Sequence, residues 1–331
     1  MSTILDVAKE AGVSIATVSR VLNQSCRVRT ETRERVLRAV ERLQYAPDAS
    51  AKNLRSRRTN LIGVVVPDVS VEFYMELIKG IENTAMNSEY NLIICDSQND
   101  PGHEIEYTRL LTERRLDGMI LTASSMTDAQ IAALVDKGFP LVLIGRELPG
   151  GGASSVSASN RYGASLAIEH LIGHGHKRIA YIRGIRGGQD EEERFSGYQS
   201  VLAQHGMAFD QQLVEWGGYT EEGGARALEK LLARRRFSAV FAANDEMAIG
   251  VMGKARELGL SVPEDLAVIG FDNIRLAHHV HPGLTTVDQP KYNMGAAAAR
   301  KLLDMLTRGE IVYEKAVLRT ELVLRRSCGC P

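Results

Sequence analysis

The chain has 331 residues, of which 44% are hydrophobic and 24% charged, enough for two or three globular domains with their own cores. It contains no apolar run long enough to cross a bilayer, and its first residues lack the apolar stretch of a secretion signal. Its four cysteines do not follow the pattern of a disulfide framework, so we expect a cytoplasmic protein rather than a membrane or secreted one.

Charge is distributed unevenly along the chain. The formal net charge is −1, yet residues 1–60 carry two lysines and ten arginines against two aspartates and four glutamates, a net charge of +6. The remaining residues then carry a net charge of −7. A small basic head joined to an acidic body is typical of a protein that binds a phosphate backbone through the head, although a solvated basic face without a partner is the alternative.

The first residues predict two short helices on either side of Gly12, in the stretch DVAKEAGVSIATVSRVLN. Thr3 and Ser14 are placed to cap the first and the second helix. One face of the second helix is apolar and must be buried, with Val18, Val21 and Leu22. The opposite face is small, hydroxylic or basic, with Ile15, Ala16, Ser19 and Arg20. A helix-turn-helix that enters the major groove needs this pattern, and two ordinary helices of a larger bundle are the alternative.

A third helix is expected at about residues 31–44, with an inner face of Val36, Val40 and Leu43. Pro47 ends it. A short helix from Asp48 through Leu54 follows, and then an arginine-rich connection that suits a polyanion.

From residue 61 onward, short continuous apolar runs alternate with helical stretches. The first series is LIGVVVP, NLIICDS, GMILTAS and PLVLIG, and the second is IAYIRG, LVEWGGY, AVFAAND and LAVIGFDN. Such runs are typical of parallel strands that are buried on both faces in βαβ units. Two open α/β sheets in one chain predict a ligand crevice beyond the carboxyl ends of the strands. The break between the lobes falls near Asn160, and the chain returns to the first lobe near residues 286–290.

Seven blocks of the sequence have a familiar order and spacing: DVAKEAGVSIATVSRVLN, YAPDASAKNLRS, IGVVVPDVSVEFY, HLIGHGHKRIAYI, ANDEMAIG, VPEDLAVIGFDN and LTTVDQP. They resemble the lactose-repressor/galactose-repressor (LacI/GalR) family of bacterial transcriptional regulators along essentially the whole chain. The resemblance implies a three-helix helix-turn-helix head, a hinge helix and a two-lobed α/β core like that of periplasmic binding proteins, with parallel sheets. The implied domains are a head of residues 1–46, a hinge of 47–59 and a core of 60–331. Within the core, lobe 1 is expected at about 60–159 and 287–318, and lobe 2 at about 160–286 and 319–331.

The resemblance also implies the partners and the residues that bind them. The expected partners are pseudo-palindromic double-stranded operator DNA, a small-molecule effector and a second copy of the chain in a homodimer. The residues expected to contact bases are Ile15, Ala16 and Arg20. Those expected to contact phosphates are Ser14, Thr17, Ser19 and Asn23. In the hinge, Leu54 is the wedge for the minor groove, with Lys52 and Arg55 beside it.

The effector crevice implied by the resemblance combines an aromatic platform, a cation and several polar side chains, which suit a small polar ring-shaped ligand. Its residues are Phe73, Tyr74, Arg146, Arg194, Tyr219, Asn244, Asp272 and Gln289. Many sugar-binding members have aspartates where this chain has Gly145 and Ser159. These departures weaken a hexose assignment, and Arg146 favours an anionic or phosphorylated effector.

Several alternatives stand beside a ligand-controlled repressor. Two core segments, PDVSVEFYMELIKGIENTA and IGFDNIRLA, are most similar to the catabolite-control regulators of the family, whose corepressor is a phosphorylated carrier protein. A solute-binding protein is the second alternative, and it does not explain the basic head. An enzyme on the same lobes is the third, but the glycine-rich PGGGASS lacks the lysine of a P-loop and no catalytic constellation is evident. We therefore predict no enzymatic activity.

Histidine and cysteine occur in groups that suggest metal ligands. His170, His174 and His176 share one stretch, and a second group precedes Pro282. A terminal Cys-Gly-Cys, Cys328 and Cys330, has no ligand partner nearby in the sequence. We accordingly predict no metal site and no cofactor, and we interpret the acidic DEEER as a solvated helix start from which only Arg194 points inward.

The hinge yields a first prediction. Residues 48–55 are too few to form a stable helix alone, since isolated helices shorter than roughly 12–15 residues are marginal in water. Two copies that pack over the minor groove would stabilise each other there. Leu54→Ala should therefore reduce operator affinity, DNA bending and effector coupling together, while ligand binding to the core stays intact. A variant that bends DNA and responds to effector as the wild type does would remove the hinge from the mechanism.

Overall fold

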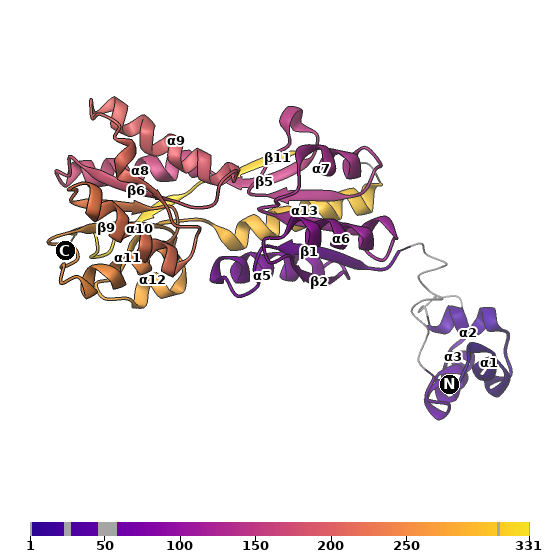
Figure 1. Cartoon of the computed structure of the whole chain (residues 1–331). Helices are drawn as coiled ribbons and strands as arrows, with labels where there is room; N and C mark the ends of the chain where they lie inside the picture. The colour runs from indigo at the N-terminus through magenta and orange to yellow at the C-terminus, as the bar shows by residue number, and fades with distance from the viewer. Residues whose placement is uncertain (1, 23–27, 46–57, 310–311, 331) are drawn as a thin grey trace. The chain divides into compact units, whose positions relative to one another are not determined.

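The computed structural model describes residues 2–22, 28–45, 58–309 and 312–330, and the chain separates into two compact units, residues 1–59 and 60–331 (Figure 1). Four of the residues assigned to DNA, Asn23, Lys52, Leu54 and Arg55, lie outside the described residues, as does Pro47. The hinge helix is therefore not tested by the structure. The helices that the structure describes include none that is both long and apolar enough to cross a membrane.

The first unit contains three helices: α1 (Ile4–Ala11), α2 (Ile15–Leu22) and α3 (Thr30–Arg42). Their shared core is centred on Val7, Val18 and Val36, each of which is fully buried. Each helix contributes one apolar stripe, so no helix could bury its own stripe without the other two. The predicted three-helix head is confirmed, and α1 begins two residues before the predicted Asp6.

The predicted caps of the first two helices are present. Thr3 forms a capping box with Asp6: the backbone N–H of Thr3 donates to the Asp6 carboxylate at 2.8 Å, and the backbone N–H of Asp6 donates to the Thr3 hydroxyl at 3.4 Å. Ser14 Oγ accepts from the backbone N–H of Thr17 at 3.3 Å. These side chains satisfy N–H groups that a helix leaves without partners in its first turn, which defines where α1 and α2 begin.

The core unit holds two six-stranded sheets. The first sheet is entirely parallel and has the order β11-β5-β4-β3-β1-β2. Its strands are β1 (Leu61–Val66), β2 (Asn91–Asp96), β3 (Gly118–Thr122), β4 (Leu141–Ile144), β5 (Ser154–Ala158) and β11 (Lys315–Leu318). One face is covered by α5 (Glu72–Met86) and α13 (Lys291–Arg308), and the other by α6 (Pro101–Thr112) and α7 (Asp128–Val135). A short 3-10 turn (Pro149–Gly151) precedes β5.

The second sheet repeats this arrangement in the order β12-β10-β9-β8-β6-β7, with only β12 antiparallel to its neighbour. Its strands are β6 (Ile179–Arg183), β7 (Val214–Trp216), β8 (Ala239–Ala242), β9 (Ala267–Asp272), β10 (Thr285–Asp288) and β12 (Glu321–Val323). The helices are α8 (Asn160–Gly173), α9 (Gln189–Gln204), α10 (Glu221–Arg234), α11 (Asp245–Glu257) and α12 (Arg275–His279), with a 3-10 turn at Gln211–Leu213. The predicted two-lobed α/β core is thus confirmed.

The chain passes between the two lobes three times: between β5 and α8, between β10 and α13, and between β11 and β12. The expected return to lobe 1 at residue 287 falls inside β10, so the chain leaves the second sheet only after Asp288. Ser159 joins the first and third crossings, because its hydroxyl accepts from the Thr320 backbone N–H at 3.0 Å and lies 3.1 Å from the Thr320 hydroxyl. The first and third crossings therefore lie side by side, and the candidate site lies next to the first.

Candidate functional site

In the head, α2 presents the face that the sequence assigned to DNA bases. Ile15, Ala16 and Arg20 are exposed, whereas Val18 and Val21 on the opposite side are buried. Ile15 is a large aliphatic residue and is 43% exposed, which leaves its apolar surface available for contact with a partner. A helix with one buried stripe and one bare face of this kind can be inserted in a groove without unfolding the head.

Three of the residues assigned to phosphates lie at the start and along the edge of the same helix. Ser14 is exposed, and Thr17 and Ser19 are half-buried. The hydroxyls of Ser14 and Thr17 are 3.0 Å apart, so each can hold the other in position while a lone pair or proton remains for a further partner. Hydroxyls at the beginning of a helix are suited to a DNA phosphate, because the helix N-terminus favours negative charge.

In the core, the candidate site is built around the buried guanidinium of Arg194 on α9, which is 4% exposed. Its Nε donates to Asn160 Oδ1 at 2.9 Å, and its Nη1 donates to the Ala243 carbonyl. Nη1 is also 3.9 Å from the Asp272 carboxylate, and the guanidinium stacks on the Phe271 ring at 4.0 Å from its centroid. Contacts from the first crossing and from the ends of β8 and β9 therefore converge on one cation.

Asp272 ends β9 and is held on both its backbone and its side chain. Gln289 Nε2 donates to the carboxylate at 2.6 Å, and the buried Lys291 Nζ donates to the Asp272 carbonyl at 2.6 Å. The φ angle of Asp272 is 116°, a sparsely populated value for a residue other than glycine. Such backbone strain occurs where the surrounding structure over-determines a functional side chain.

Asn244 and Tyr219 form the part of the site that follows β8 and β7. Asn244 caps α11, since its Oδ1 accepts from the Met247 backbone N–H at 3.0 Å, and its Nδ2 donates to the Tyr219 carbonyl at 3.1 Å. Tyr219 adopts a left-handed φ of 64°, and its ring lies over Gly184, where a side chain would collide with it. The tyrosine ring is thereby held in place from two directions.

Lobe 1 contributes Phe73 and Tyr74 from the first turn of α5. Their rings meet edge to face with centroids 5.2 Å apart, and both pack against the core of lobe 1. Burial, together with the nearby Asp272 and Tyr219, raises the pKa of Tyr74 well above its ordinary value. Since Asp272 and Tyr219 belong to lobe 2, the Tyr74 phenol of lobe 1 lies close to residues of the other lobe, and it stays neutral.

Arg146, another predicted crevice residue, follows Gly145, and its side chain bonds within lobe 1. Its guanidinium donates to the carbonyls of Ser124, at 2.8 Å, and Met126, and it pairs with Asp128. All three partners belong to the segment after β3 and the start of α7 in lobe 1. Its partners are thus separate from those of Arg194.

Sequence reasoning missed two residues of the site, Asn160 and Asp190. The Asn160 side chain bridges the cluster: its Oδ1 accepts from Arg194, and its Nδ2 donates to the Asp190 carboxylate at 2.8 Å. Asp190 Oδ2 lies so close to Gly145 that a Cβ added there would be 2.6 Å away. A carboxylate from α9 therefore lies against position 145, where the sequence has no side chain.

The interpretation of DEEER as a solvated helix start is wrong. Glu191 is fully buried and accepts from Arg183 Nε at 2.8 Å, and Asp190 lies against the first crossing. Asp190 and Glu191 point inward because cations and amides on neighbouring elements require partners, whereas Glu192 is exposed. The local sequence does not show this orientation, because the partners of these acidic side chains lie on other elements of the fold.

Two acidic groups of the crevice have pKa values near neutrality. Burial, above all, raises the pKa of Asp190 to about 7, against the opposing effect of Arg194. Burial and the nearby Asp272 and Asp68 raise the pKa of Glu246 to about 7. Carboxylic acids shifted in this way occur at functional sites and in buried networks of charged groups. The sequence could have indicated Glu246 as a site residue, because it follows a buried strand and lies two residues after Asn244.

Comparison with known proteins agrees with the division of the chain into a helical head and a two-lobed core. The family model described as "Bacterial regulatory proteins, lacI family" matches residues 3–48, and the model "Periplasmic binding protein-like domain" matches residues 168–328. The chain is 38% identical to catabolite control protein A of Priestia megaterium, over 98% of each chain. It is 37% identical to the HTH-type transcriptional regulator GalR of Escherichia coli (strain K12), over 100% of this chain and 97% of that one.

Two solved structures extend the similarity to three dimensions. The lac repressor dimer bound to operator and the anti-inducer ONPF matches with a TM-score of 0.89 and 27% identity, over 99% of both chains. The complex of the transcriptional regulator CelR with cellobiose matches with a TM-score of 0.76 and 34% identity, over 99% of this chain and 100% of that one. Both the head and the two-lobed core are covered.

The raised pKa of Asp190 gives a second prediction. Its ordinary pKa is 3.8, so between that value and about 7 the folded protein holds a proton that the unfolded chain has released. This group's contribution to stability therefore falls as the pH rises through this window and is constant above it. The stability of Asp190→Asn relative to wild type should therefore rise by about 3 kcal/mol between about pH 5 and about pH 8.

Thermal unfolding at several pH values measures this difference. Asp304→Asn, which removes a carboxylate exposed on α13, is the matched control and should give a difference that is nearly independent of pH in this range. A stability difference for Asp190→Asn that does not change with pH would contradict the assignment.

Proposed function

Because the chain belongs to the LacI family of bacterial regulatory proteins, we propose that it is a sequence-specific DNA-binding repressor whose operator affinity is controlled by a small polar effector in the crevice of the core. The observation that carries this proposal is the set of polar contacts around Arg194, which joins the first crossing to the ends of β8 and β9. A ligand that binds there contacts the segments that link the two lobes.

The head supplies the DNA-binding surface. Arg20 can donate two hydrogen bonds to a guanine in the major groove, whereas Ile15 and Ala16 offer apolar contact, for example to a thymine methyl group. All three are exposed on α2, which supports their assignment to bases. Ser14, Thr17, Ser19 and Asn23 are proposed to bind phosphates, and Lys52, Leu54 and Arg55 to bind the minor groove.

The crevice is best suited to a sugar or a similar polyhydroxylated ligand. Asp190 and Asp272 offer carboxylate oxygens, Asn160 and Asn244 offer amides, and the phenol of Tyr74 stays neutral on the facing lobe. Such alternating donors and acceptors, with aromatic rings beside them, are what sugar hydroxyls and ring faces require. Asp190 brings a carboxylate to Gly145, where the sequence lacks one, and this supports a sugar.

Arg146 is a weaker candidate for an anionic effector than the sequence indicated, since its guanidinium already has three partners in lobe 1. We therefore favour a neutral sugar over a sugar phosphate. The similarity to a regulator solved with cellobiose and to one solved with ribose supports the same ligand class.

The alternatives are less well supported. A solute-binding protein would match the core alone, whereas the similarity to GalR and catabolite control protein A includes the head. These relatives are regulators over their whole length, which supports a non-enzymatic role for this chain. Similarity to catabolite control protein A makes a phosphorylated carrier protein the second candidate for the controlling partner. We propose a homodimer on a pseudo-palindromic operator in the cytoplasm, since paired heads read DNA with two-fold symmetry.

The DNA contact of the head is tested by Arg20→Ala. Loss of a bidentate contact to a base should weaken binding to the preferred operator by about 1–3 kcal/mol and relax its sequence preference. Fluorescence anisotropy on operator and random DNA across a salt titration measures both effects. Arg42→Ala is the control, because Arg42 pairs with Glu10 within the head at 2.9 Å. An equal loss on operator and random DNA would show that Arg20 contacts only phosphate.

The effector site is tested by Asp272→Asn, which keeps the size of the side chain and removes its charge. A panel of mono- and disaccharides should contain one that raises the wild-type melting temperature and changes operator affinity. A ligand at a hundred times its Kd stabilises by about 2.7 kcal/mol. The variant should lose both responses while its operator affinity without ligand stays within a few-fold of wild type, and Asp304→Asn should keep both. If Asp272→Asn retains the full response, the proposed crevice is wrong.

A further inference from the structure

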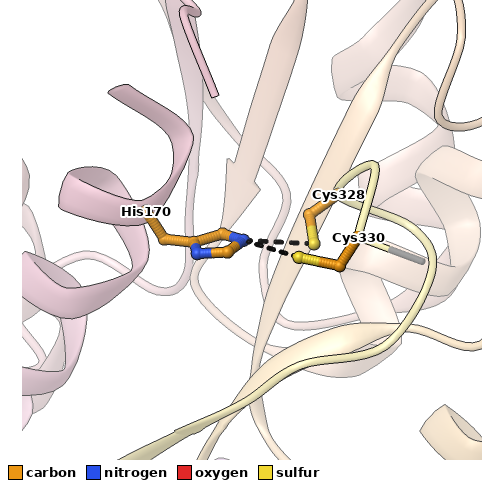
Figure 2. A group of neighbouring side chains, drawn as sticks. All are labelled: His170, Cys328 and Cys330. Carbon is orange, nitrogen blue, oxygen red and sulfur yellow. Dashed lines mark hydrogen bonds between the residues drawn. The ribbon is translucent and has the colours of Figure 1, made fainter. Parts of the chain in front are cut away.

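A cluster of histidine and cysteine side chains lies in the second lobe, away from the crevice (Figure 2). His170 Nε2, near the end of α8, is 3.3 Å from Cys328 Sγ and 3.5 Å from Cys330 Sγ. These three ligand atoms all lie within 4.8 Å of one another. His174, which caps the end of α8, places its Nε2 3.5 Å from Cys330 Sγ.

The terminal cysteines have no ligand partner nearby in the sequence, but the structure brings His170 beside both of them. His170 and Cys328 are separated by 158 residues in the sequence, so a search for closely spaced ligands could not find the cluster. The fold brings them together because the C-terminal segment returns along the second sheet to the end of α8 (Figure 1).

The spacing of the cluster corresponds to the edges of a tetrahedral metal site. With Zn–S of about 2.3 Å and Zn–N of about 2.0–2.1 Å, a tetrahedral angle separates sulfur from nitrogen by about 3.6 Å. The three sulfur–nitrogen distances of 3.3–3.5 Å are close to this value. An ion could therefore be bound with small movements of the side chains.

The segment that carries the cysteines is held in place by hydrogen bonds of its own. Ser327 Oγ donates to the Val268 carbonyl at 2.6 Å and accepts from the Thr285 backbone N–H at 2.8 Å. Gly329 has a φ of 93°, which only glycine adopts readily, and this turn lets the thiols on either side of it face His170. The ligands are thus preorganised by contacts that do not involve an ion.

A neighbouring hydroxyl is placed to stabilise a thiolate. Thr285 Oγ1 is 3.0 Å from Cys328 Sγ and already accepts from the Arg325 backbone N–H at 2.8 Å. Its own proton is consequently free to point toward the sulfur. Hydrogen bonds of this kind orient metal ligands and favour their charged form.

We propose that His170, Cys328 and Cys330 bind one thiophilic divalent cation of the Zn²⁺ class. His174 lies beside Cys330 but outside this group of three, and its side chain would move inward to take the fourth position. On binding, each cysteine releases its thiol proton to solvent and forms a metal–sulfur bond, while the imidazoles bind through Nε2 without loss of a proton. Closed tetrahedral sites of two cysteines and two histidines are structural. The ion would fasten the C-terminal segment to α8, whose opposite end carries Asn160 of the crevice.

Titration of the full-length, reduced and metal-free protein with Co²⁺ tests the proposal. One equivalent per chain should produce thiolate-to-cobalt charge-transfer absorption and the intense visible bands of tetrahedral coordination, and Zn²⁺ should abolish both. Cys330→Ser and His170→Ala should each weaken Co²⁺ binding by more than about 100-fold, since loss of a ligand should exceed the loss measured for outer-shell partners.

Matched controls remove other thiols and imidazoles without touching the cluster. Cys95→Ser, in lobe 1, and His279→Ala, exposed on α12, should bind Co²⁺ as the wild type does. The proposal is overturned if the wild type shows no charge-transfer absorption, or if Cys330→Ser binds Co²⁺ with wild-type affinity and spectrum.

A stability measurement gives an independent readout. Free Zn²⁺ at a hundred times its Kd should raise the melting temperature of the wild type by roughly 5 °C and that of Cys330→Ser by less than about 1 °C. An equal Zn²⁺-induced rise in melting temperature for both proteins would place zinc elsewhere and overturn the proposal. This comparison holds even if the variant is less stable, because each protein is compared with its own metal-free form.

Discussion

The core depends on the constraint that the buried guanidinium of Arg194 must be surrounded by partners. A cation in the protein interior is tolerated only where hydrogen bonds and opposite charge replace its water, and removal of one partner from such a group costs about 3–5 kcal/mol. Here the partners are Asn160, the Ala243 carbonyl and Asp272, from three separate segments of the chain. Their mutual position is therefore defined by one charged group, and with it the shape of the crevice.

This constraint also explains why a ligand in the crevice can influence the rest of the molecule. Asn160 follows the first crossing between the lobes, and Lys291 follows the second and donates to the Asp272 carbonyl. A ligand that exchanges hydrogen bonds with Asp190 or Asp272 thus changes contacts at two of the three crossings. Because packed interfaces have a few discrete arrangements rather than a continuum, a small change there is sufficient to favour one lobe arrangement, with coupling of typically about 1–3 kcal/mol.

The helix α8 connects the two polar clusters of the second lobe. Its first residue, Asn160, contacts Arg194 and Asp190, and His170 near its last turn contacts both terminal cysteines. Between them the helix buries an apolar face that includes Ala164, Ala167 and Ile168 in the core of the lobe. A helix so fixed at both ends and along one side behaves as a rigid element, and a metal ion at its far end would add to the stability of the lobe that forms most of the crevice.

The sequence by itself determined the features that depend on neighbouring residues. The Thr3 cap, the buried and bare faces of α2 and the two series of buried strands follow from hydrophobic periodicity and capping chemistry, and the family motifs added Arg194, Asp272 and Gln289. Only the tertiary structure decided that Asp190 lies against Gly145, that Arg146 bonds within lobe 1, and that His170 meets Cys328 and Cys330. Periodicity reports which face of a helix or strand is buried, whereas the partner of a buried polar group is set by chain crossings between residues far apart in the sequence.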